Sequence, residues 1–270
     1  MKESQVIKNT AHPITKARLI KDLNKLNLKN EIVLTHISLS SIGWISGGAI
    51  TLIQALLESV SNKGTIVMPT QSGDNSDPAD WENPPVPTAW LQTLYETMPA
   101  YDVLSTPTRN MGKTAELFRT YPGVYRSNHP MVSFAAIGDD ANAVIKNHAL
   151  TPMFGHQTPL DVLYQKRAKI VFIGTDYDTC TALHYAEYLA KTCEKKKHSC
   201  ARLNNGQREW VSFTDYDYTA DDFQAIGLAY EKTKAVETIT IGQAKSKCID
   251  FRDLIDFGTD WLLKNRQTHK

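Results

Sequence analysis

Short apolar runs and helical apolar patterns alternate along the chain. Uninterrupted apolar runs, typical of buried strands, occupy residues 30–36, 64–69, 131–137 and 168–174, with a shorter run at 238–242. Apolar positions at helical spacing predict helices at 16–26, 49–60, 90–98, 114–120, 140–147, 159–164, 183–190, 223–232 and 251–265. Asn204-Asn205-Gly206 between alternating stretches predicts a hairpin within residues 201–219, because Asn-Gly supports positive backbone angles.

This alternation predicts an α/β fold. Uninterrupted apolar strands are buried on both faces, so we expect a three-layer α/β/α arrangement with a mostly parallel central sheet and an attached antiparallel hairpin. The sequence has no internal repeat and no convincing linker, so residues 1–270 are interpreted as a single domain. The Asp, Asn, Ser and Pro content of residues 71–87 predicts a long irregular loop, and such loops are commonly functional.

Composition excludes several classes of protein. A hydrophobic content of 41% over 270 residues is ample for a core, and a net charge of +1 gives no general attraction to nucleic acid or membranes. The sequence has no apolar run of membrane-spanning length, and its first 16 residues lack the apolar centre of a signal peptide, so we expect a cytoplasmic protein. The four cysteines form no CxxC pair and are expected to be reduced. A monomer and a homodimer both remain open.

Two segments combine hydroxyls with glycines or cations at expected strand and helix ends. Residues 36–48, HISLSSIGWISGG, follow an expected strand, so the next helix could bind an anion at its N-terminus, or be an ordinary helix capped by Ser46. Residues 105–113, STPTRNMGK, could hold an anion or form a capped turn with solvated charges. His129 could contact the same ligand, although a structural role in the turn before Pro130 is favoured.

The most informative segment is GTDYDTCTALHYAEY, residues 174–188, which ends an expected strand and begins a helix. His184 and Glu187 are three residues apart and share one helix face, so the carboxylate could orient the imidazole as a general base. A structural histidine and a metal ligand are the alternatives. Metal binding is disfavoured because no second His belongs to the motif, and the spacing of Cys193, His198 and Cys200 matches no common zinc pattern.

Four blocks in this order resemble the aminoglycoside N3-acetyltransferase family, also called the antibiotic N-acetyltransferases, and most closely its YokD-like branch. The blocks are HISLSSIGWISGGAITLIQAL, GTIVMPTQSGDNSDPADWENPPVPTAW, MPAYDVLSTPTRNMGKTAELFRTYPGVYRSNHPMVSFAAIG and GTDYDTCTALHYAEY. The resemblance covers nearly the whole chain. It implies direct transfer of acetyl from acetyl-coenzyme A to an amine, in known members the 3-amino group of a 2-deoxystreptamine ring.

The resemblance also implies residue roles. His184 is similar to the family's catalytic histidine, with Glu187 and Asp178 at the acidic positions around it and Thr181 as a neighbouring hydroxyl. The residues that resemble the coenzyme A site, with His129 added as a possible contact, are His36, Ser38, Leu39, Ser40, Ile42, Gly47, Gly48, Ser105, Thr106, Pro107, Thr108, Arg109, Met111, Lys113 and His129. Arg109 and Lys113 are expected to neutralise its phosphates, and no metal is implied.

The acceptor is the open part of the interpretation. A polycationic aminoglycoside should bind among carboxylates, and the candidates are Asp74, Asp77, Asp80, Glu82, Asp215 and Asp217. The family's usual His-Ser-Ser-Leu start is His-Ile-Ser-Leu here, which removes one hydroxyl at Ile37. An acetyltransferase for a different amine, a coenzyme A-binding protein without catalysis and a metal-dependent hydrolase built on His184 are the rival functions.

Overall fold

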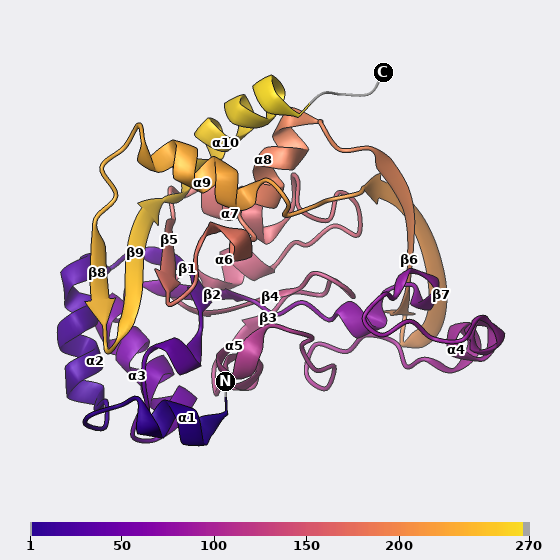
Figure 1. The fold of residues 1–270 in the computed structure, drawn as a ribbon. Helices are drawn as coiled ribbons and strands as arrows, with labels where there is room; N and C mark the ends of the chain where they lie inside the picture. Colours follow the sequence, from indigo (N-terminus) through magenta and orange to yellow (C-terminus); the bar gives the residue numbers. More distant parts are fainter. Residues whose placement is uncertain (1, 267–270) are drawn as a thin grey trace.

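A mixed seven-stranded sheet lies at the centre of the protein, and residues 2–266 are described in the computed structural model (Figure 1). Within these residues the sheet order is β3-β4-β2-β1-β5-β9-β8. The strands are β1 (Ile32–Ile37), β2 (Thr65–Pro69), β3 (Tyr125–Arg126), β4 (Phe134–Gly138), β5 (Lys169–Ile173), β6 (Lys195–Asn204), β7 (Gln207–Tyr216), β8 (Thr238–Ile241) and β9 (Ala244–Asp250). The prediction of an α/β fold is confirmed.

Helices cover both faces of this sheet, as the pattern predicted (Figure 1). The helices among residues 2–266 are α1 (Glu3–Lys8), α2 (Lys16–Leu23), α3 (Gly48–Val60), α4 (Leu91–Thr97), α5 (Gly112–Arg119), α6 (Ala141–Ile145), α7 (Pro159–Gln165), α8 (Leu183–Ala190), α9 (Phe223–Glu231) and α10 (Phe251–Asn265), of which α4 lies away from the sheet (Figure 1). Alternate strand residues enter separate cores: Val33 packs with α2, α3 and α5, whereas Leu34 packs with the helices α6 to α10. No helix among residues 2–266 is long and apolar enough to cross a membrane.

The sheet is less parallel than the sequence predicted. Only the pairings of β1 with β2 and with β5 are parallel. The pairings β2–β4, β3–β4, β5–β9 and β8–β9 are antiparallel. β9 was missed because Lys245 and Lys247 interrupt its apolar pattern, and it follows β8 after only Gly242 and Gln243, a connection too short for a parallel crossover.

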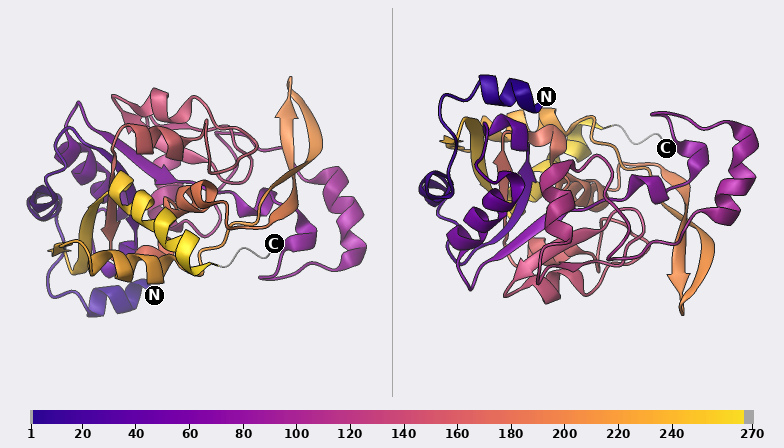
Figure 2. Two further views of the ribbon diagram at one scale, coloured as in Figure 1. Left: turned by 90° about the horizontal axis from the view of Figure 1, so that it is seen from above. Right: turned by 90° about the horizontal axis from the view of Figure 1, so that it is seen from below.

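The antiparallel hairpin β6–β7 stands apart from the main sheet, beside α4, in all three ribbon views (Figures 1 and 2). Its turn at Asn205-Gly206 has two positive φ angles, 49° and 79°, which confirms the prediction from the Asn-Gly pair. The hairpin begins at Lys195, six residues before the predicted start, because charged residues 195–197 carry no apolar strand signal. Asn75 ties the irregular loop to it through a hydrogen bond to the Ala201 carbonyl at 2.8 Å.

Candidate active site

A cleft of about 930 Å³ opens where the carboxyl ends of β1 and β2 meet the first turns of α3 and α5. This position, beside the strand from which the sheet order runs both ways, is where open α/β sheets usually bind ligands. We call it the central cleft. Its lining includes these residues predicted for the coenzyme site: His36, Ser38, Leu39, Ser40, Gly47, Gly48, Met111 and Lys113.

Two helix N-termini face the central cleft without side-chain caps. α3 begins after Gly47, whose φ of 84° is left-handed, and a Cβ there would lie 2.3 Å from the Thr51 hydroxyl. Ser46 is not the cap that the sequence suggested, since its carbonyl instead accepts from Thr51. α5 begins at Gly112, also without a side-chain cap. Uncapped N–H groups and the positive ends of two helix dipoles suit a phosphate-bearing ligand.

His36 and Thr114, two residues of the central cleft's lining, each carry a buried polar atom without a hydrogen-bond partner among the described residues. The atoms are Nε2 of His36 and Oγ1 of Thr114. The His36 side chain is only 6% exposed and stacks on Phe172, and burial lowers its pKa to about 3. A neutral imidazole and a hydroxyl, both unpartnered, fit a ligand with polar groups because they are costly to leave unpaired.

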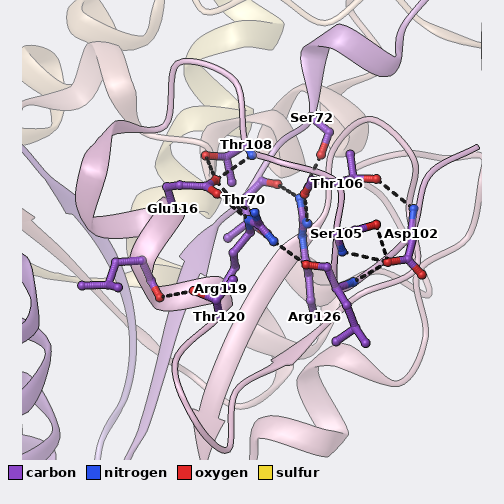
Figure 3. A network of polar contacts seen from close by, with 12 residues as sticks. Thr70, Ser72, Asp102, Ser105, Thr106, Thr108, Glu116, Arg119, Thr120 and Arg126 are labelled. Carbon is purple, nitrogen blue, oxygen red and sulfur yellow. Dashed lines mark hydrogen bonds and ion pairs between the residues drawn. The ribbon is translucent and has the colours of Figure 1, made fainter. Parts of the chain in front are cut away.

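A buried arginine holds the 105–113 segment in place (Figure 3). Arg126 donates to the Thr106 carbonyl at 2.5 Å, and to the Thr70 carbonyl and Ser72 hydroxyl at 2.7 and 2.8 Å. It lies over the Tyr101 ring, and burial lowers its pKa. Arg126 thereby joins this loop to the end of β2 beside the cleft, a role that the sequence did not reveal.

Residues 105–109, the first part of the 105–113 segment, lie outside the lining of the central cleft. Ser105 bonds Asp102 beneath the loop, and Thr106 accepts from the Asp102 N–H. Thr108 faces a neighbouring cavity of about 470 Å³, and Arg109 pairs with Asp74 at 2.8 Å. Of the residues predicted here, those that do not line the central cleft are Ser105, Thr106, Pro107, Thr108 and Arg109. Their contact with a coenzyme stays a prediction.

His129 and Ile42 are buried and do not line the central cleft. His129 is fully buried; its Nδ1 accepts from the Met131 and Val132 N–H groups at 3.1 Å, and its Nε2 lies 3.2 Å from the Leu150 carbonyl. Both ring nitrogens therefore hold the turn, which is the structural role that the sequence favoured. Ile42 has no exposed surface and packs in the core beneath the cleft.

His184 and Glu187 form the contact that the sequence predicted. Nδ1 of His184 lies 2.7 Å from Oε2 of Glu187, with the His side chain 15% exposed and the Glu side chain 0%. Burial by itself would raise the pKa of Glu187, but hydrogen bonds and charges from His184 and Arg266 hold that pKa below its ordinary value. An ionised Glu187 can only accept, so Nδ1 carries a proton, and in the neutral imidazole the lone pair is on Nε2.

Three aromatic rings surround the His184 imidazole. Phe154 stacks on it at 4.5 Å between ring centroids, and Phe223 and Tyr218 meet it edge-on at 4.8 and 5.7 Å. The Tyr218 hydroxyl is buried without a partner among the described residues, and burial raises the pKa of Tyr218. We call His184, Glu187 and these three rings the His184 pocket. Its apolar walls limit water around the imidazole while leaving one edge accessible.

Thr181 connects the central cleft with the His184 pocket, whereas Asp178 has no contact with His184 among the described residues. Thr181 lines the central cleft, and its carbonyl accepts from the His184 N–H at 3.2 Å, so His184 begins the next helical turn. Asp178 is exposed, and its N–H bonds Gln224. The structure provides no contact between Asp178 and His184 among residues 2–266, and its catalytic role stays a prediction.

Most carboxylates considered for the acceptor already have partners. Asp80 pairs with Lys196 at 3.2 Å, as Asp74 does with Arg109. Asp77 accepts from Ser199 and Tyr95, and buried Asp215 accepts from the Met153 N–H. Among residues 2–266, no group of three or more His, Cys, Asp or Glu side chains is arranged to hold a metal ion.

Several relatives match almost the entire chain. The sequence profile of the family described as aminoglycoside 3-N-acetyltransferase matches residues 34–263. The SPbeta prophage-derived aminoglycoside N(3')-acetyltransferase-like protein YokD of Bacillus subtilis is 39% identical over 97% of each chain, and its crystal structure superposes with a TM-score of 0.95.

Two further similar structures are of proteins with a bound ligand. AAC-VIa bound to sisomicin is 31% identical, covers 93% of this chain and 98% of its own, and has a TM-score of 0.84. AAC-IIIb with CoASH is 27% identical, with coverage of 95% and 98% and a TM-score of 0.82. The chain therefore belongs to the aminoglycoside 3-N-acetyltransferase family.

Proposed function

We propose that this protein transfers acetyl from acetyl-coenzyme A to an amine, with the 3-amino group of an aminoglycoside as the first candidate acceptor. The observation that carries the proposal is a histidine–carboxylate pair one helical turn from a cleft of about 930 Å³. A cleft of this size accommodates an extended cofactor-sized ligand. The structures of AAC-IIIb with CoASH and of AAC-VIa with sisomicin support the two ligand classes.

The central cleft suits the donor for reasons of chemistry. The diphosphate of coenzyme A would be met by the N-termini of α3 and α5, and Lys113 in the first turn of α5 adds a cation. The unpartnered His36 and Thr114 atoms would satisfy polar groups of the pantetheine chain or thioester. Neutral His36 is suited to this because it places no buried charge beside the apolar part of the donor.

His184 would act as the general base. An ammonium group cannot attack a thioester, so the acceptor must lose a proton to Nε2 of His184 before or as its nitrogen attacks the carbonyl carbon. Glu187 would stabilise the resulting imidazolium and keep its ring oriented. General acid–base catalysis of this kind typically contributes about 10²- to 10⁴-fold to a rate.

Collapse of the tetrahedral intermediate completes the reaction. The C–N bond is already present in this intermediate; as the C–S bond breaks, the departing coenzyme A thiolate takes a proton, which the His184 imidazolium can supply, and the nitrogen releases its remaining extra proton to solvent to give the amide. Backbone N–H groups or hydroxyls near Ser38 and Thr106 remain the candidates for stabilising the oxyanion. Thr181, whose hydroxyl was predicted to take part in catalysis, lies between the central cleft and the His184 pocket, where acceptor and thioester would meet.

An acetyltransferase for a less cationic amine is the second candidate. The ion pairs Asp74–Arg109 and Asp80–Lys196 reduce the negative charge expected to attract a polycationic aminoglycoside. Both pairs are partly exposed, so each contributes little to stability and a cationic ligand could displace the basic partner. Acceptor profiling separates the two candidates, since only the first requires 2-deoxystreptamine compounds to outcompete simple amines.

Two measurements test the proposal together. Calorimetry should show coenzyme A binding, and release of free thiol from acetyl-coenzyme A should depend on an added amine from a panel that includes kanamycin-, gentamicin- and neomycin-type compounds. A ligand at about 100 times its Kd should add roughly 2.7 kcal/mol of stability in a thermal-shift screen. If the protein shows no coenzyme A binding and no amine-dependent release of thiol, the proposal of acetyl transfer is refuted.

A further inference from the structure

Arg266, at the end of α10, reaches the carboxylate that orients His184. Its Nη1 donates to Oε1 of Glu187 at 2.6 Å, while Oε2 of the same carboxylate faces the imidazole at 2.7 Å. On its other side, Nε and Nη2 of Arg266 lie 2.9 and 2.8 Å from Oδ2 of Asp222. The family match ends at residue 263, so this cation lies outside the segment that identifies the family.

The other groups around the pair are neutral or distant from the imidazole. The Cys193 thiol donates to Oε1 of Glu187 at 3.2 Å and lies 3.1 Å from Nη1 of Arg266. Burial and the adjacent carboxylate raise the pKa of Cys193 to about 12, so it stays protonated. The Tyr218 hydroxyl is neutral as well, because burial raises its pKa. Among the described residues, the charges facing Glu187 are therefore Arg266 and, behind it, Asp222.

We propose that Arg266 is a positioning residue that holds Glu187 against His184 and sets the pH at which the imidazole loses its proton. Glu187 is fully buried, and beside its contact with His184 it receives both an opposing charge and a directed hydrogen bond from Arg266. Its importance for turnover rests on the proposed acetyl transfer through His184. The positioning itself does not depend on which amine is acetylated.

Charge determines the direction of the effect. In Arg266→Met, the negative charge of Glu187 acts on the imidazole unopposed, so protonated His184 is stabilised. Loss of a like charge from the far side of the shared carboxylate predicts an upward shift of the titration midpoint on the order of one pH unit. Asp222→Asn has the opposite sign, because it leaves Arg266 without its second anion and disfavours protonated His184.

NMR titration of the His184 ring in protein with labelled histidine measures these midpoints without requiring any enzymatic activity. The resonance is assigned by its loss in His184→Gln. We expect a higher midpoint in Arg266→Met and a lower one in Asp222→Asn. The matched control is Arg252→Met, an arginine on the same helix that bonds the carbonyls of Tyr164 and Gln165 instead of the pair. It should leave the midpoint unchanged.

The outcomes separate this proposal from the proposed function. If folded Arg266→Met keeps the wild-type midpoint, Arg266 does not set the proton affinity of His184 and the inference is wrong. If Arg266→Met does not fold, Asp222→Asn decides by the sign of its shift, since a shift upward or no shift contradicts the inference. If the midpoints move as expected but no amine is acetylated, the inference holds and the acetyltransferase assignment fails.

Discussion

The central cleft and the His184 pocket adjoin, yet they are built from different parts of the chain. Backbone groups at strand and helix ends form much of the central cleft. Among residues 2–266, Lys113 is the cation in its lining. Side chains brought from far apart form the His184 pocket: Phe154, Glu187 and Tyr218 surround one imidazole, and Arg266 closes it from 79 residues beyond Glu187.

This difference separates binding from chemistry. Uncapped helix ends and glycine turns bind the phosphates of any ligand of suitable shape, so the central cleft should tolerate single side-chain changes. The His184 pocket depends on one proton-accepting nitrogen and one buried carboxylate, so a single side-chain change there should abolish most of the activity. Substitutions in the two regions should therefore affect different kinetic constants.

The largest expected effect belongs to His184→Ala. Loss of the general base should reduce kcat by about 10²-fold or more while the Kd for coenzyme A stays within about twofold, because the imidazole does not line the central cleft. Steady-state kinetics and calorimetry on the same protein measure the two quantities. The matched control is His156→Ala, an exposed histidine that packs on Tyr185 and Tyr188.

Equal losses in kcat and in coenzyme A affinity in His184→Ala would mean that the two regions are not separable. A normal rate in that variant would remove the histidine from the mechanism altogether.

Sequence reasoning succeeded where the signal was local. The apolar runs of β1, β2 and β5 and the Asn205-Gly206 turn were recognised because each depends on a few adjacent residues. The orientation of β4 and β9 could not be predicted, since it depends on which strands become neighbours. Lys245 and Lys247 concealed β9 because its pairing with β5 and β8, rather than apolar alternation, holds that strand in the sheet.

The same limit applies to the candidate site. The His184–Glu187 pair could be predicted because both residues lie on one turn of α8. Tyr218 and Arg266 were missed because they reach the pair from just after β7 and just after α10, and only the folded chain brings them together. For His129 the sequence left a ligand contact open beside the favoured structural role, and in the structure its ring nitrogens contact neighbouring backbone groups.

Acid should destabilise the protein through buried histidines that lack an anionic partner, His36 in the lining of the central cleft and His129 in the turn before β4. Burial lowers the pKa of His36 to about 3 and that of His129 to about 4, below the value near 6.5 of an unfolded chain. The unfolded state then binds more protons, so the stability these residues contribute is complete above pH 6.5 and declines as pH falls toward 4 and 3. At pH 5 each should reduce the free energy of unfolding by about 2 kcal/mol.

Urea unfolding between pH 7 and pH 5 measures this dependence. His129→Asn keeps an acceptor near the turn but takes up no proton on unfolding. The slope of its free energy of unfolding against pH should therefore be smaller by about 1.4 kcal/mol per pH unit, the contribution of roughly one proton. An unchanged slope in this variant would show that His129 takes up no proton on unfolding. His184 differs from both histidines because Glu187 faces it, so the comparison of the two regions extends to their response to acid.

The smallest effect is expected for Lys113→Ala at the start of α5. Lys113 is exposed in the lining of the central cleft, so removing its charge should raise the KM for acetyl-coenzyme A by roughly three- to tenfold at low salt with kcat nearly unchanged. Because exposed charges are screened, the difference should shrink as salt increases toward 0.5 M. The control is Lys63→Ala, an exposed lysine just before β2 at the opposite edge of the sheet, which should leave KM unchanged. A fall in kcat without a change in KM would instead place Lys113 with the chemistry of the His184 pocket and break the division between the two regions.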